Sequence, residues 1–122
     1  MKETVRVGIV GSRSITDEEY VFYVLNFYLR RLLAEKEVII VSGGAVGIDK
    51  IAEKFAEQKG IETEIYEPEY DKFPPKVAPI KRNQTIVDNS DYLIAITTGS
   101  SGTASTIKMA EKKNIPIKIV KI

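Results

Sequence analysis

The chain has 122 residues, of which 43% are hydrophobic and 29% charged, and this length fits one domain, which we expect to span residues 1–122. The formal net charge is +1, so the composition provides no strong attraction to nucleic acid or to an anionic membrane. The absence of cysteine and histidine excludes disulfides, cysteine–histidine zinc sites, thiolate nucleophiles and any catalysis that needs an imidazole base.

The first predicted elements are a strand and a long helix. Residues 4–10 (TVRVGIV) are rich in β-branched side chains, which is typical of a strand. Thr16 lies three positions before Glu19, and this capping-box pattern predicts a helix that runs to about Lys36.

A glycine-rich loop joins the second predicted strand to the second helix. Residues 38–42 (VIIVS) form a short apolar run without alternation, as expected for a strand that is covered on both faces. The loop then leads into a helix from about Val46 to Lys59, which Gly60 ends. Residues 61–67 (IETEIYE) alternate with polar side chains and predict a third strand.

The second half of the chain repeats this alternation of strands and helices. A proline-containing loop covers residues 67–79, and helical spacing resumes from about Ile80 to Asn89. Residues 92–97 (YLIAIT) form a continuous apolar run that predicts a fourth strand. A loop of small residues leads to a helix over 103–113, and residues 115–122 predict a fifth strand.

This order of elements predicts an α/β, single-domain, three-layer Rossmann-like fold. We expect a five-stranded parallel sheet in the order 3-2-1-4-5, with helices on both faces. Lys118 and Lys121 favour an edge position for the fifth strand. In such sheets ligands bind beyond the carboxyl ends of the strands, where the strand order reverses. We therefore expect the loops GSRS (11–14), SGGAVG (42–47) and TGSSGT (98–103) to meet at one place.

Two of these loops have the composition of an anion-binding site. Glycines between Ser42 and Asp49 permit positive φ and close approach of a ligand, and the next helix directs unpaired N–H groups outward. Tight strand-to-helix packing is the alternative interpretation. In the later loop, Ser100 and Ser101 are candidate donors to phosphate oxygens, and Thr103 is a candidate helix cap. A hydroxyl-rich cap without a ligand is the alternative there.

Four charged or polar side chains near these loops are candidate ligand contacts. Arg13 follows the first strand, and arginine suits bidentate recognition of phosphate or carboxylate; a solvated surface arginine is the alternative. Arg82 and Asn83 lie on a predicted helix, where a face exposed to water is the alternative. Asp49 lies in a first helical turn, where it interacts favourably with the helix dipole or bonds to a ribose hydroxyl or to the loop itself.

Several motifs together resemble a known superfamily. GSR (11–13), SGGAVGID (42–49) followed by Ala52, RN (82–83) and GSSGT (99–103) before a helix resemble the SLOG superfamily. This Rossmann-like group contains the DNA-processing protein Smf/DprA, the cytokinin-activating LOG phosphoribohydrolases and the small YspA-like proteins, and the compact size is closest to the YspA-like branch. The resemblance implies a nucleotide or nucleotide-derivative site, with the phosphate between the two glycine loops. The binding positions that it implies are Ser12, Arg13, Gly43, Gly44, Ala45, Gly47, Asp49, Arg82, Asn83, Gly99, Ser100, Gly102 and Thr103.

One position departs from the pattern of the LOG enzymes, GGxGTxxE, which ends in a catalytic glutamate. GSSGTAST places Ser100 at the second glycine and Thr106 at the glutamate. A carboxylate that stabilises an oxocarbenium-like centre or activates water is therefore missing from that position. Asp49 and Asp71 are other carboxylates, but no pattern positions either of them for this role. We predict no catalytic residue, no metal and no cofactor.

Three functions are compatible with these motifs. We favour binding or sensing of a nucleotide-like ligand without turnover. The alternatives are cleavage of a nucleoside monophosphate at its base–ribose bond, as in LOG enzymes, and binding of single-stranded DNA, as in DprA. The near-neutral charge and the lack of alternating aromatic and basic residues disfavour the last. The ligand itself is not identified; Tyr70 or Phe73 is a candidate to stack on a base, or only to pack its loop.

The first helix predicts a homodimer. Tyr20, Tyr23 and Phe27 form an aromatic stripe that lies apart from the apolar arc suited to the sheet. We expect this stripe to contact a second copy of the chain, and burial under a neighbouring helix of the same chain is the alternative. The apolar arc consists of Val21, Val24, Leu25, Tyr28, Leu29 and Leu32.

The sequence contains no N-terminal signal segment and no long apolar run, so we expect a cytoplasmic protein without a membrane partner. Frequent isoleucine, lysine and glutamate, with no cysteine, favour a thermophilic source.

Overall fold

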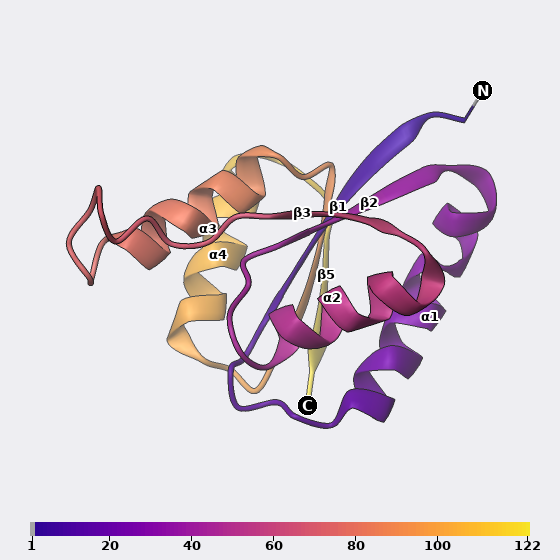
Figure 1. Cartoon of the computed structure of the whole chain (residues 1–122), viewed down its shortest axis with the longest axis horizontal. Helices are drawn as coiled ribbons and strands as arrows, with labels where there is room; N and C mark the ends of the chain where they lie inside the picture. The colour runs from indigo at the N-terminus through magenta and orange to yellow at the C-terminus, as the bar shows by residue number, and fades with distance from the viewer. Residues whose placement is uncertain (1) are drawn as a thin grey trace.

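The computed structural model describes residues 2–122, which form five β-strands and four α-helices that alternate along the chain (Figure 1). The strands pair in parallel in the order β3-β2-β1-β4-β5, which confirms the predicted Rossmann-like sheet. β5 lies at one edge, with Lys118 and Lys121 exposed as predicted. The elements are β1 (Thr4–Gly11), α1 (Glu18–Glu35), β2 (Glu37–Ser42), α2 (Ile48–Lys59), β3 (Glu62–Ile65), α3 (Ala78–Asp88), β4 (Tyr92–Thr97), α4 (Ser101–Lys112) and β5 (Ile117–Lys121).

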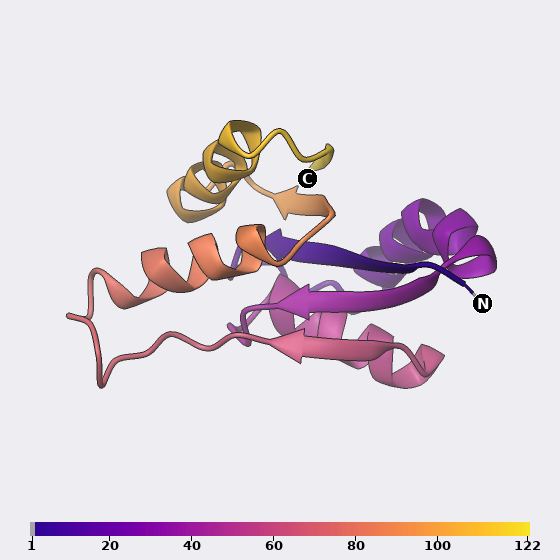
Figure 2. The same ribbon diagram turned by 90° about the horizontal axis from the view of Figure 1, so that it is seen from above.

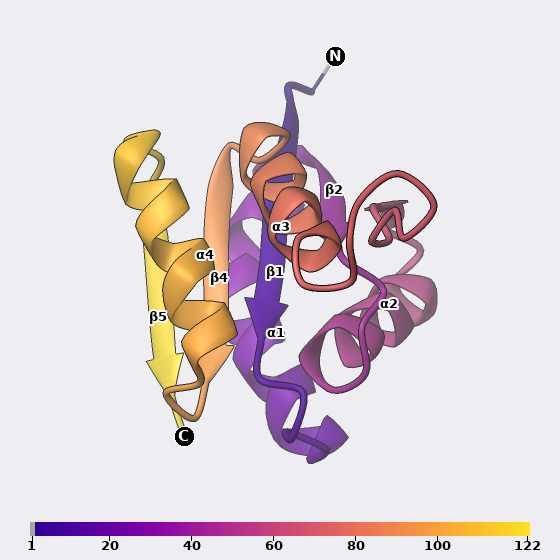
Figure 3. The same cartoon turned by 90° about the vertical axis from the view of Figure 1, so that its left-hand side faces the viewer.

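The helices cover the sheet in pairs, α1 and α2 on one face and α3 and α4 on the other (Figure 3). Side chains alternate along β1, so that Val7 and Ile9 join the apolar cluster beneath α1 and α2, whereas Val10 joins the cluster beneath α3 and α4. Phe55 of α2 is fully buried and packs edge-to-face on Phe22 of α1, with ring centroids 5.5 Å apart. Burial on both faces explains why β2 and β4 are nearly continuous apolar runs in the sequence.

Two helices begin one or two residues away from the predicted positions. α1 is capped by Asp17, whose carboxylate accepts a hydrogen bond from the N–H of Tyr20 at 3.1 Å, so the capping box predicted at Thr16 is wrong. Aspartate is the better cap because its charge also interacts with the positive end of the helix. α2 begins at Ile48 because Gly47 has a φ of +80°, a conformation outside the helical range.

The second half of the chain also shows small differences from the predicted boundaries. α4 has Ser100 as its N-cap, so the predicted cap at Thr103 is wrong, because Thr103 already lies inside the first turn. α3 begins at Ala78, and Pro79 lies in its first turn, where a missing N–H removes no helical hydrogen bond. β3 ends at Ile65, two residues before the predicted end.

The aromatic stripe on α1 is exposed in this chain. Tyr20, Tyr23 and Phe27 are 39%, 68% and 50% exposed, while Leu25 and Leu29 of the same helix are fully buried against the sheet. Burial of the stripe under a neighbouring helix of the same chain is therefore excluded for the residues that the structure describes.

The loops after β1, β2 and β4 meet at the carboxyl end of the sheet, where the strand order reverses between β1 and β4. Figure 2 shows the strands running in one direction toward this end. The glycine loop after β2 packs directly on the loop after β1. A Cβ added at Gly47 would lie 2.6 Å from the carbonyl oxygens of both Ser12 and Arg13, so this contact requires glycine.

Replacement of Gly47 by alanine measures how much this contact contributes to stability. We expect the free energy of unfolding to fall by roughly 3 kcal/mol, because a Cβ adds a clash with backbone atoms to the strain of a positive φ. Gly60→Ala is the matched control, since its φ is +69° but a Cβ there meets nothing within 4 Å. The control should lose only about 1 kcal/mol. Urea denaturation measures both variants, and equal losses would show that the loop contact contributes nothing.

Candidate functional site

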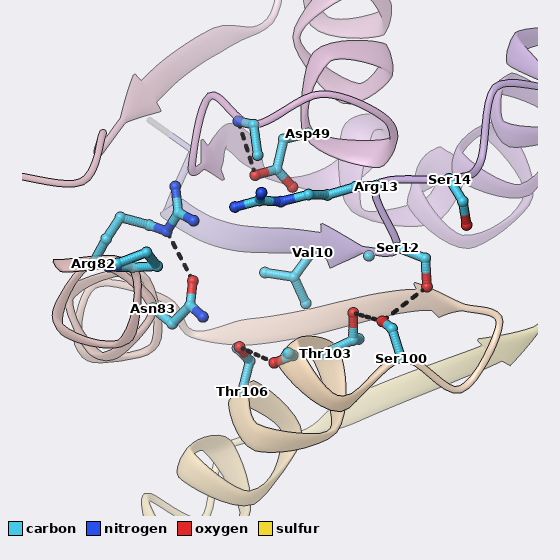
Figure 4. Close-up of a pocket in the computed structure, with 14 residues that line it drawn as sticks. Val10, Ser12, Arg13, Ser14, Asp49, Arg82, Asn83, Ser100, Thr103 and Thr106 are labelled. Carbon is cyan, nitrogen blue, oxygen red and sulfur yellow. Dashed lines mark hydrogen bonds between the residues drawn. The ribbon is translucent and has the colours of Figure 1, made fainter. Parts of the chain in front are cut away.

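A cavity of about 400 Å³ opens at the carboxyl end of the sheet, between the loops after β1 and β2 and the first turns of α3 and α4 (Figure 4). This volume lies within the range of roughly 300–1,000 Å³ that is typical of small-molecule sites. Small, hydroxyl-bearing and charged residues dominate the wall. It consists of Val10, Gly11, Ser12, Arg13, Ser14, Ala45, Asp49, Pro79, Arg82, Asn83, Ser100, Gly102, Thr103 and Thr106.

A cluster of hydroxyl groups lies where β1 and β4 end. The buried Ser12 Oγ lies 3.0 Å from Ser100 Oγ and 3.3 Å from Thr97 Oγ1, and it accepts hydrogen bonds from the N–H and the hydroxyl of Thr98 at 3.0 and 3.2 Å. Ser100 Oγ also lies 3.0 Å from Thr103 Oγ1. A hydroxyl donates one hydrogen bond and accepts two, so Ser12 does not bond to all its neighbours at once. The five hydroxyl groups of this cluster share four hydroxyl–hydroxyl contacts, so at least one hydroxyl proton has no partner within the cluster.

The N-terminus of α4 also contributes to the wall. Gly102 and Thr103 of its first turn line the cavity, and the N-cap Ser100 makes no side-chain capping bond. The first N–H groups of a helix have no partner within the helix, and they carry the positive end of its dipole. A Cβ added at Gly102 would meet no atom within 4 Å, so packing does not require glycine there. The missing side chain leaves these N–H groups accessible from the cavity.

Arg82 is a buried cation of the site, with only 7% of the residue exposed. Its Nη1 donates to the carbonyl oxygen of Gly43 at 2.5 Å, and its Nε donates to Asn83 Oδ1 at 2.8 Å. These bonds use two of the five N–H donors of a guanidinium group, and the others remain for a ligand. The alternative of a water-exposed helix face is therefore wrong for Arg82.

Arg13 extends into the same cavity from the loop after β1 (Figure 4). Burial lowers the pKa of Arg82, the nearby Asp49 carboxylate opposes this shift, and the positive charge of Arg13 adds to it. Two guanidinium groups thus face one cavity and repel each other through it. An anion bound between them would relieve this repulsion and accept hydrogen bonds from both.

Asp49 is buried, and this burial raises its pKa to about 6 from an ordinary value of 3.8. The N–H of Ala45 donates to Asp49 Oδ2 at 3.3 Å, so Asp49 bonds to its own loop, one of the roles expected from the sequence. A Cβ added at Gly43 would lie 2.7 Å from Arg82 Nη1 and 2.8 Å from Asp49 Oδ2. Glycine at this position therefore lets the cation and the carboxylate approach the same stretch of backbone.

The structure brings the three predicted loops together, but only some of the predicted residues line the cavity. The predicted residues that do not line it include three glycines with positive φ, which determine the path of the loops. The predicted residues that line the cavity are Ser12, Arg13, Ala45, Asp49, Arg82, Asn83, Ser100, Gly102 and Thr103. Those that do not line it are Gly43, Gly44, Gly47, Gly99 and Ser101.

Sequence reasoning missed several residues of the wall. Val10, Gly11, Ser14 and Pro79 line the cavity, and Thr106, considered only as the replacement of a catalytic glutamate, does so too. Ser14 directly follows the GSR motif, and Pro79 lies three residues before the buried arginine. Their positions close to a predicted site residue could therefore have identified Ser14 and Pro79 as part of the wall. Gly11 is the first residue of the GSR motif and could have been identified in the same way, whereas nothing in the sequence distinguishes Val10, near the end of its strand, from a core residue.

None of the helices within residues 2–122 is long and apolar enough to cross a membrane. The same part of the chain places no three carboxylates close enough together to hold a metal ion.

The sequence and the fold resemble those of known proteins. A sequence model of the YspA, cpYpsA-related SLOG family (YAcAr) matches residues 5–73. The X-ray structure of DNA processing protein A (DprA) from Streptococcus pneumoniae matches with a TM-score of 0.75 and 22% identity, over 95% of this chain and 50% of that one. The X-ray structure of TM1055, a structural genomics target, matches with a TM-score of 0.65 and 22% identity, over 96% of this chain and 72% of that one. No curated protein matches the sequence. At this identity the two structures show a shared fold, and the chain spans about half of the DprA chain.

Asp49→Asn tests the burial of the carboxylate through the pH dependence of stability. The pKa of Asp49 is raised in the folded state. The contribution of this group to the free energy of unfolding is therefore complete below pH 3.8 and is lost as the pH rises through about 6. Between pH 3.5 and 8, wild type should therefore lose roughly 2–3 kcal/mol of unfolding free energy relative to Asp49→Asn, which does not titrate.

Urea denaturation over this pH range measures the difference between the two proteins. Asp17→Asn is the control, because the Asp17 side chain is an exposed helix cap. Parallel pH profiles for wild type and Asp49→Asn would show that the carboxylate is solvated and not buried.

Proposed function

The chain belongs to the YspA, cpYpsA-related SLOG family, and we propose that it binds a nucleotide or another nucleotide-derived phosphate ligand in the cavity at the carboxyl end of its sheet. One observation carries this proposal. Two guanidinium groups, those of Arg13 and Arg82, and the uncapped N-terminus of α4 line the same cavity.

The charges of the wall suit a phosphate group. A phosphate monoester carries about 1.5–2 negative charges at pH 7. The two arginines and the positive end of α4, which is equivalent to about half a charge, supply about 2.5 positive charges. The Asp49 carboxylate of the same wall, with a pKa of about 6, is largely ionised at pH 7 and reduces this to roughly 1.5, which is close to the charge of the phosphate. Further donors are a hydroxyl of the Ser12 cluster and the side-chain amide nitrogen of Asn83, whose oxygen already accepts from Arg82. The ligand therefore gains several charge-assisted hydrogen bonds on one side of the cavity.

The wall favours binding over turnover. Thr106 stands where LOG enzymes have their glutamate, and its Oγ1 donates to the carbonyl oxygen of Gly102 at 3.1 Å. Asp49 is the sole carboxylate among the described residues of the wall, and it accepts from the backbone of its own loop. A hydrolase needs a free carboxylate beside the glycosidic bond, and neither the Thr106 hydroxyl nor the Asp49 carboxylate provides one.

Single-stranded DNA is the second candidate ligand, because DprA, a DNA processing protein, has the same fold. The net charge of +1 disfavours it, since binding of nucleic acid derives much of its affinity from released counterions. Oligonucleotide binding that weakens steeply with salt and is lost in Arg13→Ala would favour DNA over a free nucleotide.

We also propose that α1 pairs with α1 of a second copy. In an antiparallel pair whose two-fold axis crosses the exposed face of α1 at the level of residue 25, Tyr23 of each copy lies opposite Phe27 of the other. The same axis places Glu19 of one copy near Arg30 and Arg31 of the other, so the two copies have complementary charges. Arg30 already lies over the Phe27 ring, 5.2 Å from its centroid, at the edge of the aromatic stripe.

Arg13→Ala tests the ligand proposal with little risk to the fold, because Arg13 is exposed. Loss of a charged hydrogen bond of about 1.5–3 kcal/mol should weaken binding of a nucleoside monophosphate by about 10- to 100-fold. Isothermal titration calorimetry with AMP, GMP and ribose 5-phosphate measures this change. Lys108→Ala, an exposed lysine on α4 that does not line the cavity, is the control and should bind as wild type does.

Two results would contradict the ligand proposal. The first is the absence of saturable binding for all three phosphate compounds. The second is release of free base during the titration, since this would make the protein a hydrolase.

Tyr23→Glu tests the dimer. A charge in the middle of the aromatic stripe should convert the protein to a monomer, because an unpaired carboxylate would be buried in the interface. Light scattering measures the mass in solution. Tyr70→Glu is the matched control, since Tyr70 is 58% exposed and lies far from α1 in the sequence. An unchanged mass for Tyr23→Glu would refute the proposed interface.

A further inference from the structure

A second cavity, of about 390 Å³, lies between α3 and the segment that follows β3. Figure 2 shows this segment running outward from the end of β3, beside α3, before it turns back into that helix. The cavity is lined by Ile65, Tyr66, Glu67, Glu69, Phe73, Ala78, Lys81, Arg82, Gln84 and Thr85.

Arg82 is the residue that the two cavities share. Its guanidinium group is anchored to the carbonyl of Gly43, at the point where the glycine loop leaves β2. In Figure 4, Arg82 lies toward one end of the first cavity and Ser100 toward the other. The two cavities therefore adjoin at Arg82, at the end of the first cavity that lies farther from Ser100 in Figure 4.

The two cavities differ in chemistry. No aromatic side chain is among the described residues of the first cavity, whose wall carries hydroxyl groups, amide groups and charges. The second cavity has the rings of Tyr66 and Phe73 together with the apolar side chains of Ile65 and Ala78. An aromatic ring of a ligand thus finds aromatic stacking partners among the described residues of the second cavity and not among those of the first.

The aromatic residues are held in place before any ligand binds. The hydroxyl of Tyr66 donates to Glu64 Oε1 at 3.1 Å, and its backbone N–H donates to the carbonyl of Ser42 at 2.9 Å. The N–H of Phe73 donates to the carbonyl of Glu69 at 3.1 Å, and Lys81 Nζ lies 5.9 Å from the centroid of the Phe73 ring. A ring that binds here meets preformed partners, which lowers the entropy cost of binding.

Polar groups on the wall of the second cavity match the edge of a nucleobase. Glu67 and Glu69 supply acceptors, Lys81 and Arg82 supply donors, and the Gln84 amide supplies both. Nucleobases carry donors and acceptors on the edge of a flat aromatic ring, so they match both features of this cavity.

We propose that the second cavity binds the base of the nucleotide whose phosphate occupies the first cavity, with Arg82 between the two ends of the ligand. This proposal rests on the proposed function and specifies it: the ligand is a nucleoside monophosphate, and Phe73 and Tyr66 recognise its base. A sugar phosphate without a base fills only the first cavity.

Comparison of AMP with ribose 5-phosphate in calorimetry tests this assignment. Phe73→Ala should weaken AMP binding by about tenfold, since stacking on one aromatic side chain contributes about 1–3 kcal/mol. The same variant should leave the affinity for ribose 5-phosphate unchanged. Tyr92→Ala, an exposed aromatic residue at the start of β4 that lines neither cavity, is the control and should bind AMP as wild type does.

A second measurement needs no variant. In wild type, nuclear Overhauser effects should connect the base protons H2 and H8 of AMP with the ring protons of Phe73. Equal affinity for AMP and ribose 5-phosphate, unchanged in Phe73→Ala, would overturn the base site and leave the phosphate site intact. Absence of Overhauser effects to Phe73 from bound AMP would also overturn it. Failure of both compounds to bind would overturn the proposed function itself.

Discussion

The site depends on one buried hydrogen bond, from the guanidinium group of Arg82 to the carbonyl oxygen of Gly43. This bond joins α3 to the loop after β2, two segments that are 39 residues apart in the sequence. A buried cation without a partner costs several kcal/mol, so the loop and the arginine hold each other in position. The Asp49 carboxylate partly compensates the charge of Arg82, and the absence of a Cβ at Gly43 makes room for both groups.

The same hydrogen-bond network explains why the wall of the cavity has donors for an anion. The polar groups of the wall bond to the protein and keep further donors: the remaining N–H groups of the Arg82 guanidinium, the amide nitrogen of Asn83 and a hydroxyl of the Ser12 cluster. The first turn of α4 adds N–H groups that no helix satisfies internally. Donors that are already fixed need little rearrangement when a ligand arrives. The protein thus obtains a cavity with fixed hydrogen-bond donors from contacts that also stabilise its loops.

The sequence predicted the sheet well and the charged network poorly, for a physical reason. Continuous apolar runs in β2 and β4 reflect burial on both faces, which is a local property of the chain. The start of α1 was displaced because Thr16 and Asp17 are adjacent candidate caps, and their competition is decided by charge. The burial of Arg82 depends on how α3 is oriented over the sheet, which no local pattern encodes.

The two cavities also differ in how far the sequence can predict them. GSR, the glycine loop and GSSGT each follow a strand, so their meeting at the carboxyl end follows from topology alone. The second cavity depends on the path of residues 66–77, which form neither helix nor strand and carry no periodic signal. The sequence identified Phe73 as a candidate for stacking, but only the path of this segment places it on a cavity that shares Arg82.

Gly102 has a consequence for how this protein changes over evolutionary time. Its φ is not positive, a side chain there would meet no neighbour, and glycine inside a helix costs about 0.5–1 kcal/mol relative to alanine. Selection for folding alone would therefore replace it. A lineage that stopped using the cavity should drift to alanine at this position, so the residue found there in each descendant records whether the ancestral role was kept.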